Sequence, residues 1–401
     1  MTPRRVLVVL SLAELCAMAP WFSASAVSGT LTHLWDLSSA GAAWLTVGVQ
    51  LGFVTGALIS SALALSDLWS ARLLFAWSAG AAALATAAVI VAPNAGLGFA
   101  LRFLTGVALA GAYPPGMKLA AGWFRAGRGT AIGIMVGALT LGSAFPHLVR
   151  WIVPAEAWKL VVAVAALSAL LGAALILLVP NDGPYAAPSP PFSWRAVPRI
   201  LERPAIRLAN LGYLGHMWEV YAMWTWMAAF VTASESVRNP APHGPPLAPL
   251  ITFAVVGIGA PGSWLGGILA DRWGRVRTTT VAMIVSGLCC LLVGTLFGQS
   301  FLLLVPLLLI WGVSVVADSA QFSTAISELA PPEYIGTALT LQTSLGFLLT
   351  CVTILLLPVL ASYIGWRWSM AALAVGPALG VWAMQALGKR PEATLLAGGL
   401  G

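Results

Sequence analysis

The chain alternates between long apolar runs and short polar intervals. A helix needs about 20 apolar residues to cross about 30 Å of hydrocarbon, and twelve runs meet or approach that length. Lipid offers no hydrogen-bond partner to a backbone amide, and the alternating segments of a membrane barrel are missing, so the runs are expected to be helices. The predicted spans are Val6 to Ser28, Gly41 to Leu65, Arg72 to Val91, Leu97 to Ala120, Gly129 to Val149, Trp158 to Val179, Ile206 to Val231, Leu250 to Ala270, Thr278 to Phe297, Phe301 to Phe322, Ile335 to Leu360 and Trp368 to Leu387.

The spans fall into two sets of six. Residues 181–205 form the longest polar interval of the predicted cytoplasmic side and are rich in Pro and Ser, which predicts a linker between an amino-terminal bundle at 1–180 and a carboxy-terminal bundle at 206–401. Gly129-Thr130-Ala131 opens the fifth span, and Gly336-Thr337-Ala338 opens the eleventh. Such a repeat predicts two pseudo-symmetric bundles around a site at the membrane midplane.

Composition agrees with a membrane protein. Hydrophobic residues make up 59% of the 401 residues and charged residues only 8%, which is too little polar surface for a water-soluble globule. The net charge of +7 comes from Lys and Arg between the apolar runs, so nucleic acid is not an expected partner. The four cysteines lie inside the runs without metal or disulfide spacing, and no phosphate-binding loop or hydrolase elbow occurs. We therefore expect no metal, no cofactor and no enzymatic activity.

The distribution of positive charge predicts the orientation. Positive residues favour cytoplasmic loops, and an inward amino terminus places fifteen of the 20 Lys and Arg residues inside and four outside. Both termini and the linker are therefore expected in the cytoplasm, in a multi-pass protein of the bacterial inner membrane. The first run also resembles a signal peptide, but it exceeds the usual apolar length, and its removal would leave eleven spans.

One loop carries a family signature. The segment Gly267-Ile268-Leu269-Ala270-Asp271-Arg272-Trp273-Gly274-Arg275 resembles the Gly-x-Leu-Ala-Asp-Arg-x-Gly-Arg loop of the major facilitator superfamily. Asp271 at a helix end can pair with arginines, and Gly274 suits a tight turn, so the resemblance implies a gating loop. In the first half only Asp67 and Arg72 remain of it. The alternative is a loop that serves only to keep positive charge inside.

A second segment narrows the resemblance. Arg102-Phe103-Leu104-Thr105-Gly106 is similar to the fourth-helix arginine motif of this superfamily, and with Tyr113 to Lys118 it most resembles a bacterial branch described as nitrate, nitrite or cyanate porters. The second and eighth spans lack the arginines that hold the anion in those porters. The resemblance implies a secondary active transporter that works by alternating access, with an anion porter as the alternative.

Ionisable side chains at membrane depth mark functional candidates because each costs at least about 2.5 kcal/mol to insert. Glu14, Glu219 and Asp318 are the candidates for proton coupling. Arg102 is a cavity candidate and the expected cationic partner of Glu14, so that the acid alternates between neutral and charged forms. The competing account is a static ion pair between Glu14 and Arg102.

Further candidates for the cavity come from helical spacing. Trp218, Tyr221 and Thr225 share one face of the seventh span and predict a wall on which an organic solute stacks, with an interfacial aromatic belt as the alternative. Further cavity candidates are Gln321, Gln342 and His147. Gln321, one turn from Asp318, is expected to line the inner path or to solvate a helix end, and an interfacial position is the favoured interpretation of His147.

Small residues form stripes on four spans. The stripes are Gly48, Gly52 and Gly56 on the second span, Gly129, Gly133 and Gly137 on the fifth, Gly262 and Gly266 on the eighth, and Gly336, Thr340 and Ser344 on the eleventh. The resemblance implies that these helices form the contact between halves, so we expect smooth surfaces for rocking; the alternative is tight packing within one half.

These features together predict a proton-coupled transporter of a small molecule, embedded in the lipid bilayer as a monomer. An intramembrane sensor or enzyme would need a soluble domain or a catalytic pair, and the sequence shows neither.

Overall fold

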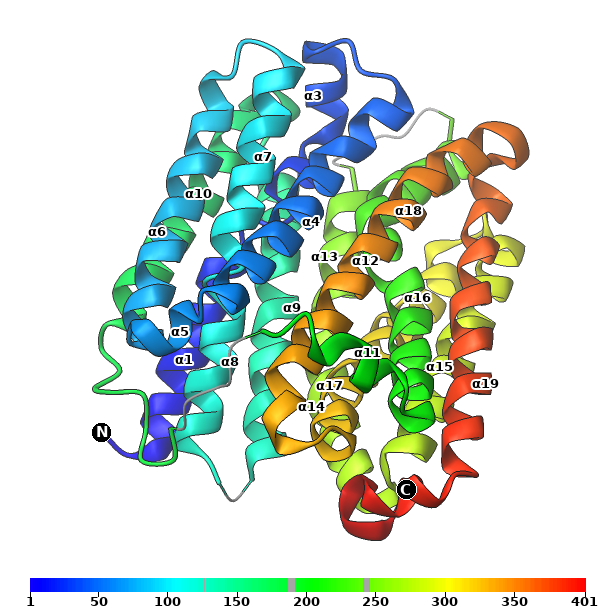
Figure 1. Ribbon diagram of the computed structural model, residues 1–401. Coiled ribbons are helices and arrows are strands. Elements are labelled where there is room, and N and C mark those ends of the chain that lie inside the picture. Colours follow the sequence, from blue (N-terminus) through cyan, green and yellow to red (C-terminus); the bar gives the residue numbers. More distant parts are fainter. Residues whose placement is uncertain (126, 187–191, 241–245) are drawn as a thin grey trace.

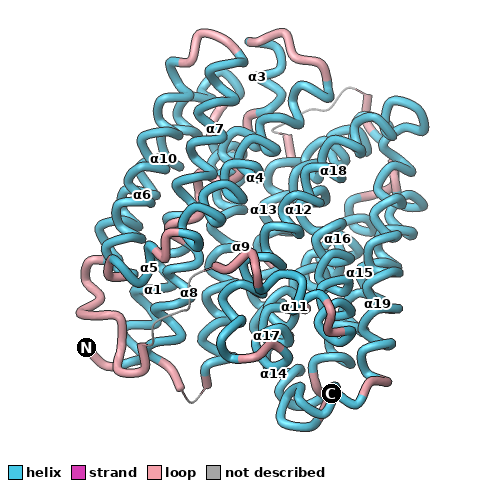
Figure 2. The backbone as a smooth tube through the Cα atoms, viewed as in Figure 1, coloured by secondary structure: helices cyan, strands magenta, loops and turns pink. Residues whose placement is uncertain are grey.

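The computed structural model describes residues 1–125, 127–186, 192–240 and 246–401. All regular structure in these residues is helical (Figures 1 and 2). The first half contains α1 (Pro3–Met18), α2 (Ser23–Ala26), α3 (Ser28–Leu34), α4 (Ser39–Ala62), α5 (Leu65–Leu68), α6 (Ala71–Ala88), η1 (Val89–Val91), α7 (Ala95–Leu109), α8 (Tyr113–Trp123), α9 (Arg128–Ile152), η2 (Ala155–Ala157) and α10 (Trp158–Ile176).

The second half repeats this plan after a short linker helix. Its elements are α11 (Ala196–Leu201), α12 (Pro204–Arg238), α13 (Ala248–Gly257), α14 (Gly259–Trp273), α15 (Arg275–Leu292), η3 (Val293–Leu296), α16 (Phe301–Ala317), α17 (Ser319–Leu329), η4 (Pro332–Tyr334), α18 (Ile335–Ser369), η5 (Met370–Ala374), α19 (Val375–Gly388) and η6 (Pro391–Gly399).

Nine helical segments within the described residues are long and apolar enough to cross a membrane. One of them, Pro332–Gly388, holds both of the last two predicted spans, which the backbone separates at Gly365, where φ is 74°. The first and seventh predicted spans are not among the nine: α1 has only 16 residues, and α12 carries polar side chains along its length. With these two helices the twelve-span architecture expected from the sequence is complete.

The first span differs from the prediction of one continuous helix. α1 ends at Met18, and the chain continues through the short helices α2 and α3 to Leu34. Pro20 explains the break, because proline has no amide hydrogen to continue the helical hydrogen bonds and its ring clashes with the carbonyl four residues earlier. Outside a regular helix, the backbone carbonyls of Pro20 and Trp21 can accept donors from other segments.

Three further spans also consist of two helices. The fourth divides at Ala110–Ala112 ahead of the Pro114-Pro115 pair, the eighth at Ile258 and the tenth at Asp318. The third of these breaks places an acidic residue at the start of an 11-residue helix inside the bundle. No proline marks that position, so the hydrophobic pattern alone did not predict it.

The two halves meet along two pairs of contacts. α4 packs against α18, and α9 packs against α13 and α14 (Figure 1). A hydrogen bond of 3.0 Å between the hydroxyls of Ser61 and Thr340 crosses the first contact.

The glycine stripes serve mostly a different purpose from the one expected. A Cβ on Gly52 would lie 1.9 Å from the carbonyl oxygen of Phe103 in α7, and one on Gly266 would lie 1.8 Å from that of Ala317 in α16. Both stripes therefore pack within their own half, as the alternative interpretation predicted. The α9 stripe fits the rocking surface, since Gly133 and Gly137 face Ser263 and Ala260 of α14, and Thr340 of the α18 stripe contacts Ser61 of the other half.

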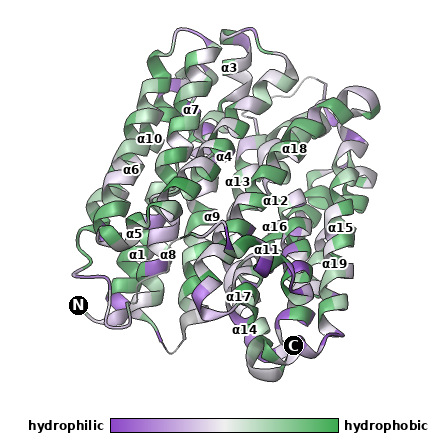
Figure 3. Ribbon diagram, viewed as in Figure 1, coloured by the Kyte–Doolittle hydropathy of each residue, from purple (hydrophilic) through white to green (hydrophobic). Residues whose placement is uncertain are grey.

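Polar residues gather at the helix ends and in the connecting segments, while apolar residues cover the helices (Figure 3). The amino terminus and η6 lie at the same end of the bundle (Figure 1). We call this end the terminal face.

Candidate functional site

A cavity of about 970 Å³ lies between the two halves. On α9 and α18 its wall includes Gly129 to Thr140 and Ile335 to Phe347, which are the parts of these helices nearest the terminal face, and on α12 it includes Tyr213 to Trp224, in the middle of the helix. The cavity therefore opens at the terminal face and ends near the middle of the bundle. In this conformation the chain is accessible from one side only.

The wall combines aromatic and polar groups. Tyr113, Tyr213 and His216 line it at depth, whereas Lys118 and Arg275 line it nearer the mouth. Rings offer faces on which planar solutes stack, and cations attract anionic groups. The chemistry of this wall suits a small organic solute with an aromatic part.

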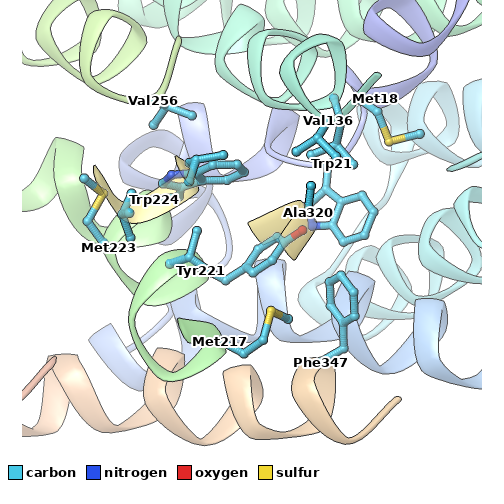
Figure 4. Packing of buried hydrophobic residues seen from close by; sticks show 14 of the residues in the cluster. Met18, Trp21, Val136, Met217, Tyr221, Met223, Trp224, Val256, Ala320 and Phe347 are labelled. Carbon is cyan, nitrogen blue, oxygen red and sulfur yellow. The ribbon is translucent and has the colours of Figure 1, made fainter. Parts of the chain in front are cut away.

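An aromatic cluster closes the inner end of the cavity. We use this name for Trp21, Phe22, Phe53, Tyr221, Trp224 and Phe347, all of which are buried. The first three belong to the first half and the others to the second. Trp21 contributes ring contacts of 5.0 Å to Phe53, 5.8 Å to Tyr221 and 5.6 Å to Phe347. Figure 4 shows the rings of Trp21, Tyr221 and Phe347 turned toward one another.

The ring contacts join the two halves. Phe53 and Phe347 have centroids 4.6 Å apart, and Phe22 lies 5.9 Å from Trp224. Contacts of this kind depend on excluding water and have little directional preference compared with hydrogen bonds. No hydrogen bond joins the described side chains of the cluster, so its rings can separate without breaking one.

Arg102 does not bind Glu14 and does not line the cavity, contrary to both expectations. Its guanidinium donates to Leu45 O at 3.1 Å, to Pro20 O at 2.9 Å, to Ser23 Oγ at 3.3 Å and to Trp21 O. The backbone carbonyls at the break after α1 accept from the guanidinium of Arg102, whereas the carboxylate of Glu14, which lies earlier in α1, does not. Arg102 therefore holds the broken segment that carries Trp21 and Phe22.

Glu14 lies inside the first half without a counter-ion. The side chain is fully buried, and neither carboxylate oxygen has a hydrogen-bond partner among the described residues. One oxygen would lie 2.6 Å from a Cβ on Gly116 of α8. A charge in such a place is costly, and the static pair with Arg102 is excluded in this conformation.

Glu219 lies inside the second half with three donors. Trp311 Nε1 and Cys290 Sγ donate to Oε1, the latter at 3.2 Å, and Ser286 Oγ donates to Oε2 at 2.9 Å. These donors come from α15 and α16, so Glu219 links α12 to both helices. The three donors fix the position of its carboxyl group between the helices.

Asp318 has a partner that the sequence did not indicate. Its Oδ1 lies 2.9 Å from His216 Nδ1, and the side chains are 2% and 3% exposed, respectively. His216 lines the cavity and has ring neighbours in Tyr213 at 6.2 Å and Phe322 at 5.7 Å. The helix break at Asp318 allows this carboxylate to reach α12.

The signature loop forms a cluster around Arg275, together with two residues of α17. Arg275 Nη1 donates to Asp271 Oδ1 at 3.2 Å and to Gln321 Oε1 at 2.9 Å, and Nη2 donates to Glu328 Oε1 at 3.2 Å. We call these four residues the Arg275 cluster. The cavity mouth is open while these bonds are intact. Opening on this side therefore does not require the bonds of the gating loop to break.

The rest of the loop takes the predicted shape. Gly274 has φ of 87°, a conformation that favours glycine, where the chain turns from α14 into α15. Gly267 faces Gly129 of the other half, and a Cβ on Gly129 would lie 3.5 Å from the Asp271 carboxylate. Arg272 is exposed. Asp271 thus stands where α9 of the first half begins.

The corresponding loop of the first half has another arrangement. Arg72 Nη1 donates to Val179 O at 2.8 Å and to Pro180 O at 3.2 Å, and so binds the end of the sixth span. Asp182 of the linker accepts from Ser70 Oγ at 2.9 Å and from Ala71 N at 3.1 Å, which caps α6. The side chain of Asp67 lies outside the described residues.

The predicted aromatic face of α12 is only partly right. Tyr221 lines the cavity, but Trp218 Nε1 donates to Ala372 O at 3.2 Å and Thr225 Oγ1 donates to Tyr221 O at 2.6 Å, and neither lines it. The cavity stripe runs through Met217, Val220 and Trp224, about one residue around the helix from the predicted face.

The other candidates are buried away from the cavity. Gln321 serves the Arg275 cluster, while Gln342 is buried in α18 with no partner for its amide among the described residues. His147 is 2% exposed in α9, so it is not the interfacial residue that was expected. The sequence also missed Trp21, Phe53 and Phe347, because ring contacts between halves leave no local pattern.

Comparison with known proteins gives the family. Residues 10–354 match the Major Facilitator Superfamily, and the chain belongs to it. The narrower resemblance to nitrate, nitrite or cyanate porters is not confirmed, because the curated relatives found are of other kinds.

Two curated relatives match parts of the chain. The Niacin transporter NiaP of Acinetobacter baylyi is 30% identical over 158 residues, which are 39% of this chain and 36% of that protein. The Probable metabolite transport protein CsbC of Bacillus subtilis is 32% identical over 126 residues, 29% of this chain and 25% of that protein. The matches thus span about a third or less of either relative.

Solved structures share the whole fold. A bacterial homologue of the human lysosomal transporter Spinster, inward-facing and unoccupied, has a TM-score of 0.73 at 15% identity and covers 96% of this chain and 97% of that one. The xylose transporter XylE from E. coli, partially occluded and inward-open, has a TM-score of 0.71 at 16% identity, covering 95% and 97%. The fold and family make this chain a membrane transporter.

Proposed function

We propose that this chain moves a small organic solute with an aromatic part across the bacterial inner membrane, by alternating access and at the expense of a proton gradient. The observation that carries the proposal is the cavity between halves, open at one face and closed at its inner end by the aromatic cluster. Closing the mouth and separating the rings would expose the same site to the other side. Both termini then lie in the cytoplasm, and the conformation is inward-facing.

The substrate class follows from the wall of the cavity. Tyr113, Tyr213, Tyr221 and Trp224 offer ring faces, and Lys118 at the mouth supplies positive charge. Aromatic monocarboxylates such as nicotinate combine these two requirements. The partial likeness to a niacin transporter supports this choice.

Uptake into proteoliposomes tests the function. We expect radiolabelled nicotinate, or benzoate as a second aromatic acid, to exchange against unlabelled compound of the same kind, whereas xylose and nitrate do not. Accumulation of nitrate alone would favour the anion-porter alternative. Failure of every compound to exchange would contradict the proposed substrate class.

Two tryptophan substitutions distinguish a role in the cavity from an effect on the fold as a whole. Trp224→Leu removes a ring that lines the cavity and should reduce exchange by about tenfold, since one aromatic contact contributes about 0.5–1.5 kcal/mol beyond its buried area. Trp382→Leu is the matched control, because its side chain is 60% exposed on α19. Equal loss in both variants would show that the cavity ring has no special part in binding.

A substitution in the signature loop is expected to have a smaller effect on the rate of exchange. Asp271 is half-exposed and holds Arg275 beside the start of α9, and a pair of this kind contributes about 0.2–1 kcal/mol. Asp271→Asn should therefore slow nicotinate exchange by about two- to fivefold at normal expression. Glu333→Gln, an exposed acid at η4, should leave the rate unchanged. An unaltered rate in Asp271→Asn would limit the loop to setting topology.

A further inference from the structure

We infer that His216 and Asp318 together bind the proton that drives transport, and that α17 transmits this event to the Arg275 cluster at the cavity mouth. The inference deepens the proposed function and rests on it. It assigns the coupling role to one pair among the buried acids and adds a histidine that no sequence pattern had indicated.

The pair has the composition and the position of a proton-binding site. An imidazole nitrogen and a carboxylate oxygen lie 2.9 Å apart on helices α12 and α17, at the edge of the cavity. Histidine is the side chain that changes charge most readily near neutral pH. Two titratable groups this close share their protons, so binding belongs to the pair and not to one residue.

The proton balance is simple. With neutral His216 and ionised Asp318 the pair carries one negative charge in a buried place. Uptake of one proton, either on the free imidazole nitrogen or on the carboxylate, makes the pair neutral overall. Release to the open cavity restores the negative charge. The change therefore exchanges one proton with the side on which the cavity opens.

The other two acids are less suited to this exchange. Glu219 accepts from three donors of α15 and α16 and does not line the cavity. Glu14 has no donor within the described residues and does not line the cavity. Among the three candidate acids only Asp318 contacts a basic side chain that lines the cavity, His216.

Few charged groups surround the pair. On α12 the neighbouring titratable groups are Glu219, Tyr213 and Tyr221, and across the cavity α8 presents Tyr113. α13, α16 and α19 have no charged side chain, and the charge of α18 is Arg367, near its far end. On α17 the charged group is Glu328, and on α15 they are Arg275, which binds Glu328, and Arg277. Nearer the mouth, α14 carries Asp271 and Arg272, α8 carries Lys118 and η6 carries Glu392. A proton on the pair is thus the main local change in charge.

Helix α17 connects the pair with the mouth. Asp318 precedes its first residue, Gln321 in its first turn binds Arg275 at 2.9 Å, and Glu328 in its last turn binds the same guanidinium at 3.2 Å. Asp318 joins α16 to α17, so a change in its contact with His216 acts at one end of an 11-residue helix whose other contacts hold the Arg275 cluster.

Infrared difference spectroscopy tests the proton site without any substrate. Purified protein in lipid nanodiscs is taken from alkaline to acidic pH, and the carboxylic acid band of a buried side chain is followed. We expect Asp318→Asn to lack a band present in the unmodified protein and His216→Gln to shift the pH at which it appears. A band that persists in Asp318→Asn and is lost in Glu14→Gln would overturn the inference.

Transport separates this inference from the proposed function. In Asp318→Asn and His216→Gln we expect nicotinate exchange between equal pools to persist while accumulation driven by a pH gradient is lost. If the unmodified protein exchanges no nicotinate, the proposed substrate fails and the infrared result still decides the proton site. Intact gradient-driven accumulation in both variants contradicts the inference itself.

Hydrogen exchange tests the connection through α17. Asp318→Asn should alter deuterium uptake both in residues 318–329 and in residues 271–278, compared at one pH with the unmodified protein. Glu219→Gln removes a buried acid from α12 and serves as the comparison. Changes confined to 318–329 would show that the proton site does not communicate with the Arg275 cluster.

Discussion

A Gly106→Val variant is expected to fail to assemble the first half of the molecule. A Cβ at position 106 would lie 2.0 Å from Val49 O and 2.8 Å from Phe53 N, both backbone atoms of α4. Neither atom can rotate away as a side chain can, so α4 and α7 would have to separate along their whole contact. We expect a loss of about 3 kcal/mol or more in stability, at the upper end of overpacking effects.

Thermal unfolding and gel filtration in detergent measure this effect. Gly80→Val is the matched control, because a Cβ there has no heavy atom within 4 Å and Gly80 is also a mid-helix glycine. A monodisperse Gly106→Val protein that unfolds at the unmodified temperature would refute the close approach of α4 and α7.

Arg102→Gln is expected to destabilise the chain strongly and to impair transport as well. The substitution removes charged donors from Pro20 O, Trp21 O and Leu45 O in a fully buried place, and a hydrogen bond to a charged group contributes about 1.5–3 kcal/mol. Trp21 and Phe22 lose their support at the same time. Arg102→Lys keeps the charge, but its single ammonium cannot reach carbonyls that a forked guanidinium spans, so the variant should be intermediate.

A double substitution distinguishes the carbonyl site from an ion pair. If Arg102 were paired with Glu14, adding Glu14→Gln to Arg102→Gln would recover stability by removing the stranded charge. The carbonyl contacts predict instead that the two effects add, as for independent sites. Arg150→Gln serves as a control, since this half-buried arginine donates to Val153 O at 3.0 Å at its own helix end. Recovery in the double variant would restore the ion-pair account.

Apolar run lengths predicted the class and the helical spans because burial in lipid constrains every residue of a span, and the signature loop around Asp271 predicted the family. The same pattern could not show where spans break. Pro20 suggests the first break only in retrospect, and Asp318 begins α17 without any proline nearby. The wrong partner was predicted for Arg102 for this reason, since Pro20 O and Trp21 O, which accept from its guanidinium, lie at the break in the first span.

Prediction of the site succeeded where a residue and its neighbours are close in sequence. Asp271, Gly274 and Arg275 lie within one loop, and the turn and the ion pair followed from their spacing. The His216 to Asp318 pair joins α12 to α17, and the aromatic cluster joins four separate segments of the chain. Contacts between residues that are far apart in the sequence depend on how whole helices pack. The periodicity within one helix does not specify that packing.

Ring contacts close the inner end of the cavity, whereas ionic contacts lie at its open mouth, so the two ends should respond to different conditions. The aromatic cluster relies on water exclusion, which weakens on cooling and is strengthened by excluded salts such as sulfate. Ionic contacts at the mouth are instead weakened by any added salt. Cooling should thus favour separation of Trp21 and Phe53 from Tyr221 and Phe347, and the balance between inward- and outward-facing forms becomes a function of temperature.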